Sequence, residues 1–244
     1  MDTDNLNKQA NKQLKTDTSP LGSRLIGKVL SPALKLFLRS QLEQVSHLEV
    51  KIIGSDRQIF TGSIPEVIIW ANHAIYQGLH LTQAQLVGNG ICINLGQVLK
   101  GQPLRLVEPV VVYGELLLHE ADLNTSLHSR LLSDGLTELL QLLLPANYSL
   151  NRQVSWRRIT LASNHLTLIG DLATSSRKMS LLLSCGLQLV DCHELLLTQI
   201  QLQAPDINQE KLDLSIDLGS HVDLQELTLH SGKLVCRGSI TVMP

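Results

Sequence analysis

Residues 19–46 read SPLGSRLIGKVLSPALKLFLRSQLEQVS, and their apolar side chains repeat with the period of an α-helix. At ~100° per residue, one side of this helix is apolar and the opposite side is basic. The apolar side carries Leu25, Ile26, Val29, Leu30, Ala33, Leu34, Leu36 and Phe37, and the basic stripe carries Arg24, Lys28, Lys35 and Arg39. Ser19 and Pro20 suit the N-cap and the first turn. The stretch therefore predicts a long amphipathic helix.

This helix has two interpretations. In the first, its apolar side packs on a sheet and its basic stripe simply faces water. In the second, the helix also contacts a membrane, with the stripe toward anionic head groups. We expect acyl chains or the sheet to contact Leu25, Ile26, Val29, Leu30, Ala33, Leu34 and Phe37, and head groups to contact Arg24, Lys28, Lys35 and Arg39.

From Leu48 onward, apolar and polar residues mostly alternate, which is typical of β-strands. Short turns containing Gly, Ser, Asn or Asp predict four hairpins, over residues 50–62, 84–96, 159–170 and 227–238. The pattern predicts a mainly β protein of the α+β class, with one long, curved antiparallel meander wrapping the N-terminal helix. Helical spacing in 120–127 and 134–144 predicts two short helices near the middle of the chain.

An alternating sheet has an apolar face that must be covered. The predicted helices are little cover for a sheet of this size, so an apolar groove suited to hydrocarbon would remain. A second sheet layer would instead close the interior.

Residues 1–18 are polar and lack the apolar segment of a secretory signal, so we expect this segment to be a disordered tail. We expect residues 19–244 to form one elongated domain, and we expect the protein to be in the cytoplasm.

Composition excludes several classes of function. The net charge of −2 argues against general nucleic-acid binding, and an aromatic content of 3% provides few platforms for stacking bases or sugars. Catalytic motifs such as GxSxG, HExxH and a phosphate-binding glycine loop do not occur in the sequence. The histidines and cysteines lack metal-ligand spacing. We therefore expect no enzyme activity, no cofactor and no metal.

Four segments carry a resemblance to a known family: LEVKIIGSDRQIFTGSIP (48–65), GLHL (78–81), LKGQPL (99–104) and EADLN (120–124). They resemble landmarks of the LmeA-like phospholipid-binding family of bacteria, over roughly residues 31–244. The resemblance implies phospholipid binding and a fold similar to tubular lipid-binding modules. These motifs are structural and contain no catalytic group.

Lys100 and Arg105 flank Gly101-Gln102-Pro103, a loop at the expected mouth of the groove where a phosphate would sit. Asp56-Arg57 is expected in a hairpin turn, either as a turn-stabilising pair or as a head-group contact. The sequence thus predicts a phospholipid-binding protein, acting in lipid transfer or at the surface of an anionic membrane. The alternative is a scaffold or assembly module that has a closed core and binds a protein partner.

Overall fold

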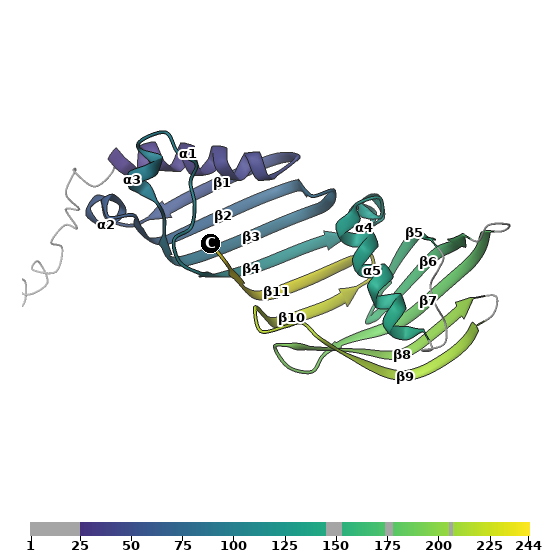
Figure 1. The fold of residues 1–244 in the computed structure, drawn as a ribbon. Helices are drawn as coiled ribbons and strands as arrows, with labels where there is room; N and C mark the ends of the chain where they lie inside the picture. Colours follow the sequence, from purple (N-terminus) through teal and green to yellow (C-terminus); the bar gives the residue numbers. More distant parts are fainter. Residues whose placement is uncertain (1–24, 145–152, 174–177, 205–206) are drawn as a thin grey trace, which may run out of the picture.

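The computed structural model describes residues 25–144, 153–173, 178–204 and 207–244, and these residues form two antiparallel sheets with five helices (Figure 1). The helices are α1 (Leu25–Gln41), α2 (Asp56–Phe60), α3 (Leu95–Val98), α4 (Glu120–Ser126) and α5 (Arg130–Leu143). Among the described residues, no helix has both the length and the apolar character required to span a bilayer.

The first sheet has six strands in the order β1-β2-β3-β4-β11-β10. Their bounds are β1 Gln44–Ile53, β2 Ser63–Tyr76, β3 Leu79–Cys92, β4 Val110–His119, β10 Val222–His230 and β11 Lys233–Val242. The β2–β3 turn consists of Gln77 and Gly78, both at positive φ, as a two-residue type I′ hairpin requires. The first four strands are consecutive in this sheet, and the last hairpin of the chain, β10–β11, completes it by pairing with β4.

The second sheet has five strands in sequential order, from β5 to β9. Their bounds are β5 Gln153–Ala162, β6 His165–Ala173, β7 Lys178–Leu189, β8 Glu194–Ala204 and β9 Ile207–Asp217. Helix α5 covers this sheet, because its buried Leu140 and Leu143 pack into a cluster with Leu168, Leu183 and Leu197. The second sheet therefore packs on a filled core, to which Leu118 of β4 and Leu229 of β10 in the first sheet also contribute.

The prediction of one continuous meander is wrong, since the strands divide into two sheets and β4 pairs with β11 rather than with β5. The mainly β class and the two central helices are confirmed. Helix α5 begins after the N-cap Ser129, because the Ser129 side chain accepts a hydrogen bond from the Leu132 amide.

Helix α1 ends at Gln41, and residues 44–46, which the sequence assigns to the helix, already belong to β1. The expected start at Ser19 and the polar tail 1–18 lie outside the described residues, so the longer amphipathic helix stays a prediction. Two of the expected hairpins, 159–170 and 227–238, are confirmed as β5–β6 and β10–β11.

The other two expected hairpins are wrong. Residues 56–60 form α2, which Ser55 caps through a capping box with Gln58. Asp56 and Arg57 are therefore helical and do not form a hairpin turn. Residues 84–92 belong to β3, which passes through Gly88 and Gly90 without reversing.

Candidate functional site

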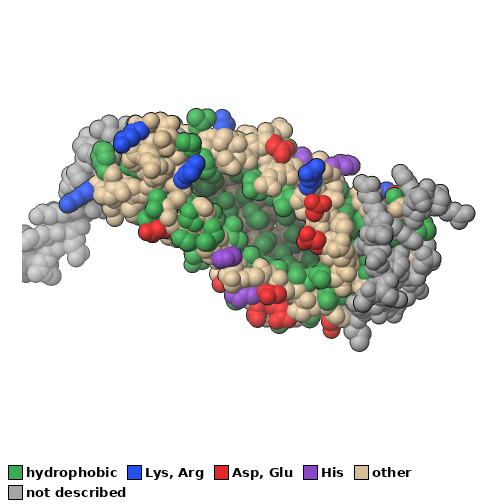
Figure 2. Space-filling model, in the orientation of Figure 1, with side chains coloured by type: hydrophobic (Ala, Val, Ile, Leu, Met, Phe, Trp, Pro, Cys, Tyr) green, Lys and Arg blue, Asp and Glu red, His purple; other side chains and the backbone are tan. Residues whose placement is uncertain are grey.

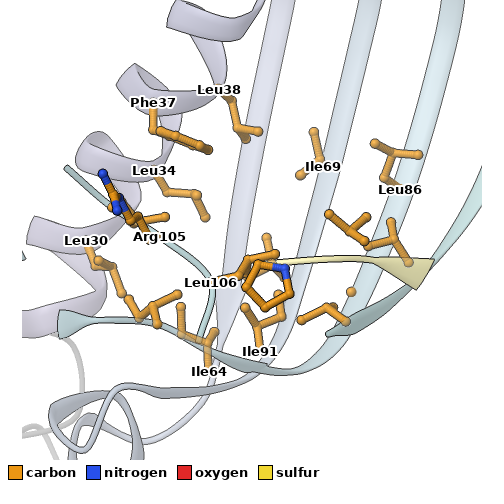
Figure 3. A pocket seen from close by; sticks show the side chains of 18 of the residues that line it. Leu30, Leu34, Phe37, Leu38, Ile64, Ile69, Leu86, Ile91, Arg105 and Leu106 are labelled. Atoms are coloured by element: carbon orange, nitrogen blue, oxygen red, sulfur yellow. The ribbon is translucent and has the colours of Figure 1, made fainter. Parts of the chain in front are cut away.

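The first sheet and α1 border a partly open apolar cavity of about 610 Å³ (Figure 3). The sheet provides its floor, and α1 lies along one side. The space-filling view shows a hollow lined by hydrophobic side chains on this face (Figure 2). A cavity of this size lies within the ~300–1,000 Å³ typical of small-molecule sites.

The lining residues come from α1, from the four strands β2, β3, β4 and β11, from the segment 93–106 and from residues 243–244. They are Leu30, Leu34, Phe37, Leu38, Ile64, Val67, Ile69, Leu86, Gly88, Ile91, Ile93, Leu104, Arg105, Leu106, Val110, Val112, Val242, Met243 and Pro244. Arg105 is the one charged side chain among these described residues. An interior with so few polar groups can hold hydrocarbon but offers little for directional recognition.

Arg105 is exposed at the rim, on the segment that runs past α1 (Figure 3). Asn94 fixes this segment. Its Oδ1 accepts the Arg105 amide at 2.8 Å, and its Nδ2 donates to the Pro103 carbonyl at 3.0 Å. No carboxylate of the described residues forms an ion pair with Arg105. Its guanidinium therefore remains available to an anion beside an apolar chamber.

Glu108 is the first acidic residue after Arg105 along this segment, and it lies beside the Cys92 thiol. Burial, together with the charge of Glu108 and a hydrogen bond to it, raises the pKa of the Cys92 thiol at the end of β3. The isolated bridge between Ile93 and Leu106 and the hydrogen bond from the Val107 amide to the Cys92 carbonyl, at 2.8 Å, hold the two segments together. The rim is thus built from backbone pairing as well as from Asn94.

The structure brings several predicted site residues to this cavity. Leu30, Leu34 and Phe37 of α1 line it, as does Arg105. Lys100 is exposed on the same segment as Arg105 but is not a lining residue, Arg39 is exposed, and Lys35 is half-buried. The assignment of these residues to acyl chains and head groups stays a prediction.

The remaining predicted residues of the N-terminal helix cannot be placed. Arg24 lies outside the described residues, and the side chains of Leu25, Ile26, Lys28, Val29 and Ala33 lie outside them as well. Leu36 does not share the apolar side assigned to it, because its side chain is 72% exposed. Leu38 takes that role instead and lines the cavity.

Sequence reasoning missed the strand residues that make the floor, which include Ile64, Val67, Ile69, Leu86 and Val112. Alternation along β2, β3 and β4 could have identified one apolar face for each strand. It could not have identified which apolar faces line a cavity and which pack into a filled core. That distinction depends on the helix that covers each sheet.

The apolar face continues beyond the cavity. Ile240 pairs with Val112 across β11 and β4, so it lies on the cavity side of the sheet, and it is 50% exposed. Further along, Cys236 pairs with Leu116 on the same side, and both are half-buried. The first sheet thus presents an apolar path leading away from the chamber.

At the other end of this path, the EADLN segment of α4 joins the two sheets. Glu120 Oε2 accepts the Leu161 amide at 2.8 Å. Asn124 pairs with the Ile159 backbone at 2.8 Å in both directions, through Oδ1 and Nδ2. Asp122 accepts a hydrogen bond from the hydroxyl of Thr82 on β3. These polar residues hold the edge of β5 against the first sheet and have a structural role.

A cluster of three charged side chains lies on the face of the first sheet that is opposite the cavity. Arg237 forms ion pairs with Glu115 at 3.0 Å and with Glu226 at 2.9 Å. The hydrogen bond and the charge of Glu115, followed by the charge of Glu226, raise the pKa of Arg237. The three charges satisfy one another on a solvated surface, so this cluster does not provide an anion site.

The described residues contain no group of three or more His, Cys, Asp or Glu side chains placed to hold a metal ion. Cys185 is buried in the second sheet, and this burial raises the pKa of its thiol to about 11. A thiol with that pKa remains protonated near neutral pH and is a poor nucleophile. Among the described residues, the candidate site is therefore the apolar cavity with its basic rim.

Comparison with known proteins supports the same interpretation. The model of the LmeA-like phospholipid-binding family matches residues 21–239, which is nearly the whole chain and includes all five helices and all strands except the last three residues of β11. No curated protein and no solved structure matches the chain. The resemblance carried by the four sequence segments is thereby confirmed, and the chain belongs to the LmeA-like phospholipid-binding family.

Proposed function

We propose that this protein binds one phospholipid molecule by placing an acyl chain in the apolar cavity and the phosphate beside Arg105. The observation that carries the proposal is a chamber of about 610 Å³ whose described lining side chains are apolar except for one arginine at the rim. A hydrocarbon chain needs the first feature and an anionic head group needs the second. The proposed action is binding, in lipid transfer or at a membrane surface, and not catalysis.

The cavity is large enough for an acyl chain, because its volume of about 610 Å³ lies within the range of small-molecule sites. Each buried methylene contributes ~0.8 kcal/mol, so one chain provides substantial affinity even after the entropy cost of binding. The apolar path past Ile240 would accommodate part of the second chain.

The alternative function, a scaffold that binds a protein partner, requires an interior filled by side chains. The second sheet has such an interior under α5, but the part of the first sheet that borders the cavity does not. The proposal also places the protein at an anionic membrane as a peripheral component. The role of the α1 basic stripe in that contact and the cytoplasmic location stay predictions.

Two neighbouring positions on β3 test the proposal. Leu86 points into the cavity, and Val87 points to the opposite face of the sheet. In Leu86→Trp, the indole occupies space that the acyl chain needs. Displacing two methylene groups loses ~1.6 kcal/mol, about tenfold in affinity. Val87→Trp adds the same side chain without entering the cavity.

The measurement is native mass spectrometry of gently purified protein, followed by reloading with phospholipid. We expect bound phospholipid in the wild type and in Val87→Trp, and strongly reduced occupancy in Leu86→Trp, with similar thermal unfolding for all three. Equal occupancy in the two variants would exclude this cavity as the lipid site. A wild type that neither carries nor takes up phospholipid would overturn the proposal.

A further inference from the structure

Helices α2 and α3 lie at the end of the first sheet that is farther from α4 and α5 (Figure 1). Each anchors itself with one buried side chain, Ile59 in α2 and Leu95 in α3, which are 1% and 6% exposed. Each also presents a large apolar side chain to solvent. Phe60, the last residue of α2, is 65% exposed, and Leu99, the C-cap of α3, is 69% exposed.

This end of the molecule is also basic. Arg57 precedes Phe60 by three residues, and Lys100 follows Leu99 directly; both are exposed. Within α2, α3 and the segment up to Glu108, there are three basic residues, Arg57, Lys100 and Arg105, and two acidic residues, Asp56 and Glu108, although the whole chain has a net charge of −2. In Figure 2, most of the visible Lys and Arg side chains lie at the end that carries α1, α2 and α3, and most of the Asp and Glu side chains lie away from it.

Local structure holds the exposed side chains outward. The Ser55–Gln58 capping box fixes the start of α2, and the Thr61 hydroxyl donates to the Gln58 carbonyl at 2.6 Å. Gly62 follows at φ 84°, and its carbonyl accepts the Ile93 amide at 2.8 Å. A Cβ at position 62 would lie 2.6 Å from the Ile93 carbonyl oxygen, so the tight junction between these segments requires glycine.

The same end adjoins the cavity. Ile59 and Leu95 belong to one buried cluster with Leu30, Ile64 and Ile93, and the last three also line the cavity. A surface docked against α2 and α3 would therefore lie next to the chamber and to Arg105. Single exposed apolar residues are common on protein surfaces, but here they coincide with basic residues and with an apolar site.

We propose that α2 and α3 form a membrane-docking tip, in which Phe60 and Leu99 insert into the interfacial region of an anionic bilayer and Arg57 and Lys100 contact lipid phosphates. This inference rests on the proposed function, because docking here brings the cavity to the source of its lipid. Two separate apolar side chains are too little area for a stable protein interface, which needs ~800 Å² per partner. They suit reversible insertion assisted by charge.

The test is flotation of the purified full chain with vesicles of phosphatidylcholine alone or of equal parts phosphatidylcholine and phosphatidylglycerol. The double variant Phe60→Ser/Leu99→Ser removes both apolar side chains that would insert into the bilayer. The matched control, Leu131→Ser/Leu142→Ser, removes two exposed leucines from α5, which are 46% and 58% exposed. Native mass spectrometry reports lipid in the cavity for each protein, independently of flotation.

We expect the wild type and the α5 control to bind the anionic vesicles, and to bind them less at high salt because the phosphate contacts are screened. The tip variant should bind at least about tenfold more weakly while retaining its phospholipid. The inference is overturned if the tip variant binds as the wild type does, if the α5 control loses as much, or if the wild type ignores anionic vesicles.

The two proposals can fail separately. Phospholipid in the cavity without tip-dependent flotation removes the docking tip and leaves the proposed function. Tip-dependent flotation of a protein that carries and accepts no phospholipid removes the proposed function and leaves the tip. A change in self-association on sedimentation, with no vesicle binding, would assign Phe60 and Leu99 to contact with a second copy and would also overturn the tip.

Discussion

Arg105 owes its place at the cavity rim to Asn94 rather than to any contact of its own guanidinium. Both ends of the Asn94 amide bind the backbone of the 103–105 segment, so the segment cannot swing away without losing two hydrogen bonds. The guanidinium, which no described carboxylate pairs with, is left for a ligand. A planar group with several donors suits a phosphate held at one place.

Reversing the charge at this position should weaken phospholipid binding. In Arg105→Glu, a carboxylate would repel the phosphate where charge-assisted hydrogen bonds had formed, and we expect affinity for phosphatidylglycerol to fall by about tenfold or more. Lys51→Glu makes the same change of charge at an exposed site on β1 and should leave the affinity unchanged. Titration of a fluorescent phospholipid measures both. Equal affinities for the two variants would remove Arg105 from the site.

Individual site residues could be predicted where they lie next to a turn or on one face of a predicted helix. Two basic residues, Lys100 and Arg105, flank Gly101-Gln102-Pro103, and this pattern identified a segment that reaches the cavity rim. Helical spacing alone misplaced Leu36, because the sheet contacts α1 over a narrower arc that includes Leu38 instead. Periodicity defines a side of a helix, whereas the neighbouring element decides which of its residues are covered.

At the level of elements, α4 is a brace between the sheets. Strand β5 is an edge strand, and its free backbone groups at Ile159 and Leu161 are paired by Asn124 and Glu120. Gly232, in the β10–β11 turn, donates its amide to the Leu161 carbonyl at 3.0 Å. Blocking the edge in this way prevents pairing with other chains and joins the two halves of the molecule.

Removing the Asn124 amide should destabilise the protein. Asn124→Ala leaves the amide and the carbonyl of buried Ile159 without partners, which costs ~2–6 kcal/mol for two such groups. Thr125→Ala is the matched control, because the Thr125 hydroxyl is exposed and donates only to the Ala121 carbonyl one turn back. We expect the control to change the free energy of unfolding by less than ~0.5 kcal/mol.

Urea denaturation followed by circular dichroism provides both free energies of unfolding. If Asn124→Ala and Thr125→Ala were equally stable, α4 would not act as the brace described above. A loss confined to the asparagine variant, with α4 intact, is the result that supports it.

Elements with a local signal were predictable from sequence, and those without one were not. The β5–β6 and β10–β11 turns carry Ser-Asn and Ser-Gly between short alternating runs, and both hairpins form. The similar Gly-Ser-Asp at 54–56 instead starts α2, because Ser55 and Gln58 form a capping box. Gly88 and Gly90 resemble turn residues but lie within β3, where the pairing of Gly88 with Val67 and Val112 continues the sheet on both sides.

At the scale of the whole molecule, two sheets with similar strands have different interiors because their helices differ. Helix α5 covers the second sheet with a row of leucines, and a filled core results. Helix α1 packs near β1 through Leu30 and Leu38, and Leu42 directly after the helix adds to this contact, whereas the middle of the first sheet stays uncovered. The cavity forms over that uncovered region.

The sequence could not predict this division. Pairing β4 with β11 brings Glu115 beside Arg237, which lies 122 residues away in the sequence, and no local pattern encodes such a contact. The excess of apolar sheet over helix was evident from the sequence, and it suggested a groove. Which sheet would hold the cavity became apparent only once the strands were divided between two sheets.

The central claim, that the first sheet and α1 hold an acyl chain, is tested most directly by paramagnetic broadening in the NMR spectrum of the protein loaded with a phospholipid spin-labelled midway along one chain. The account predicts that amide signals of Ile69, Leu86, Gly88 and Val112 broaden, whereas those of Leu168, Leu183 and Leu197 in the second sheet stay sharp. Broadening centred on the second sheet, or uniform across the loaded protein, would contradict it.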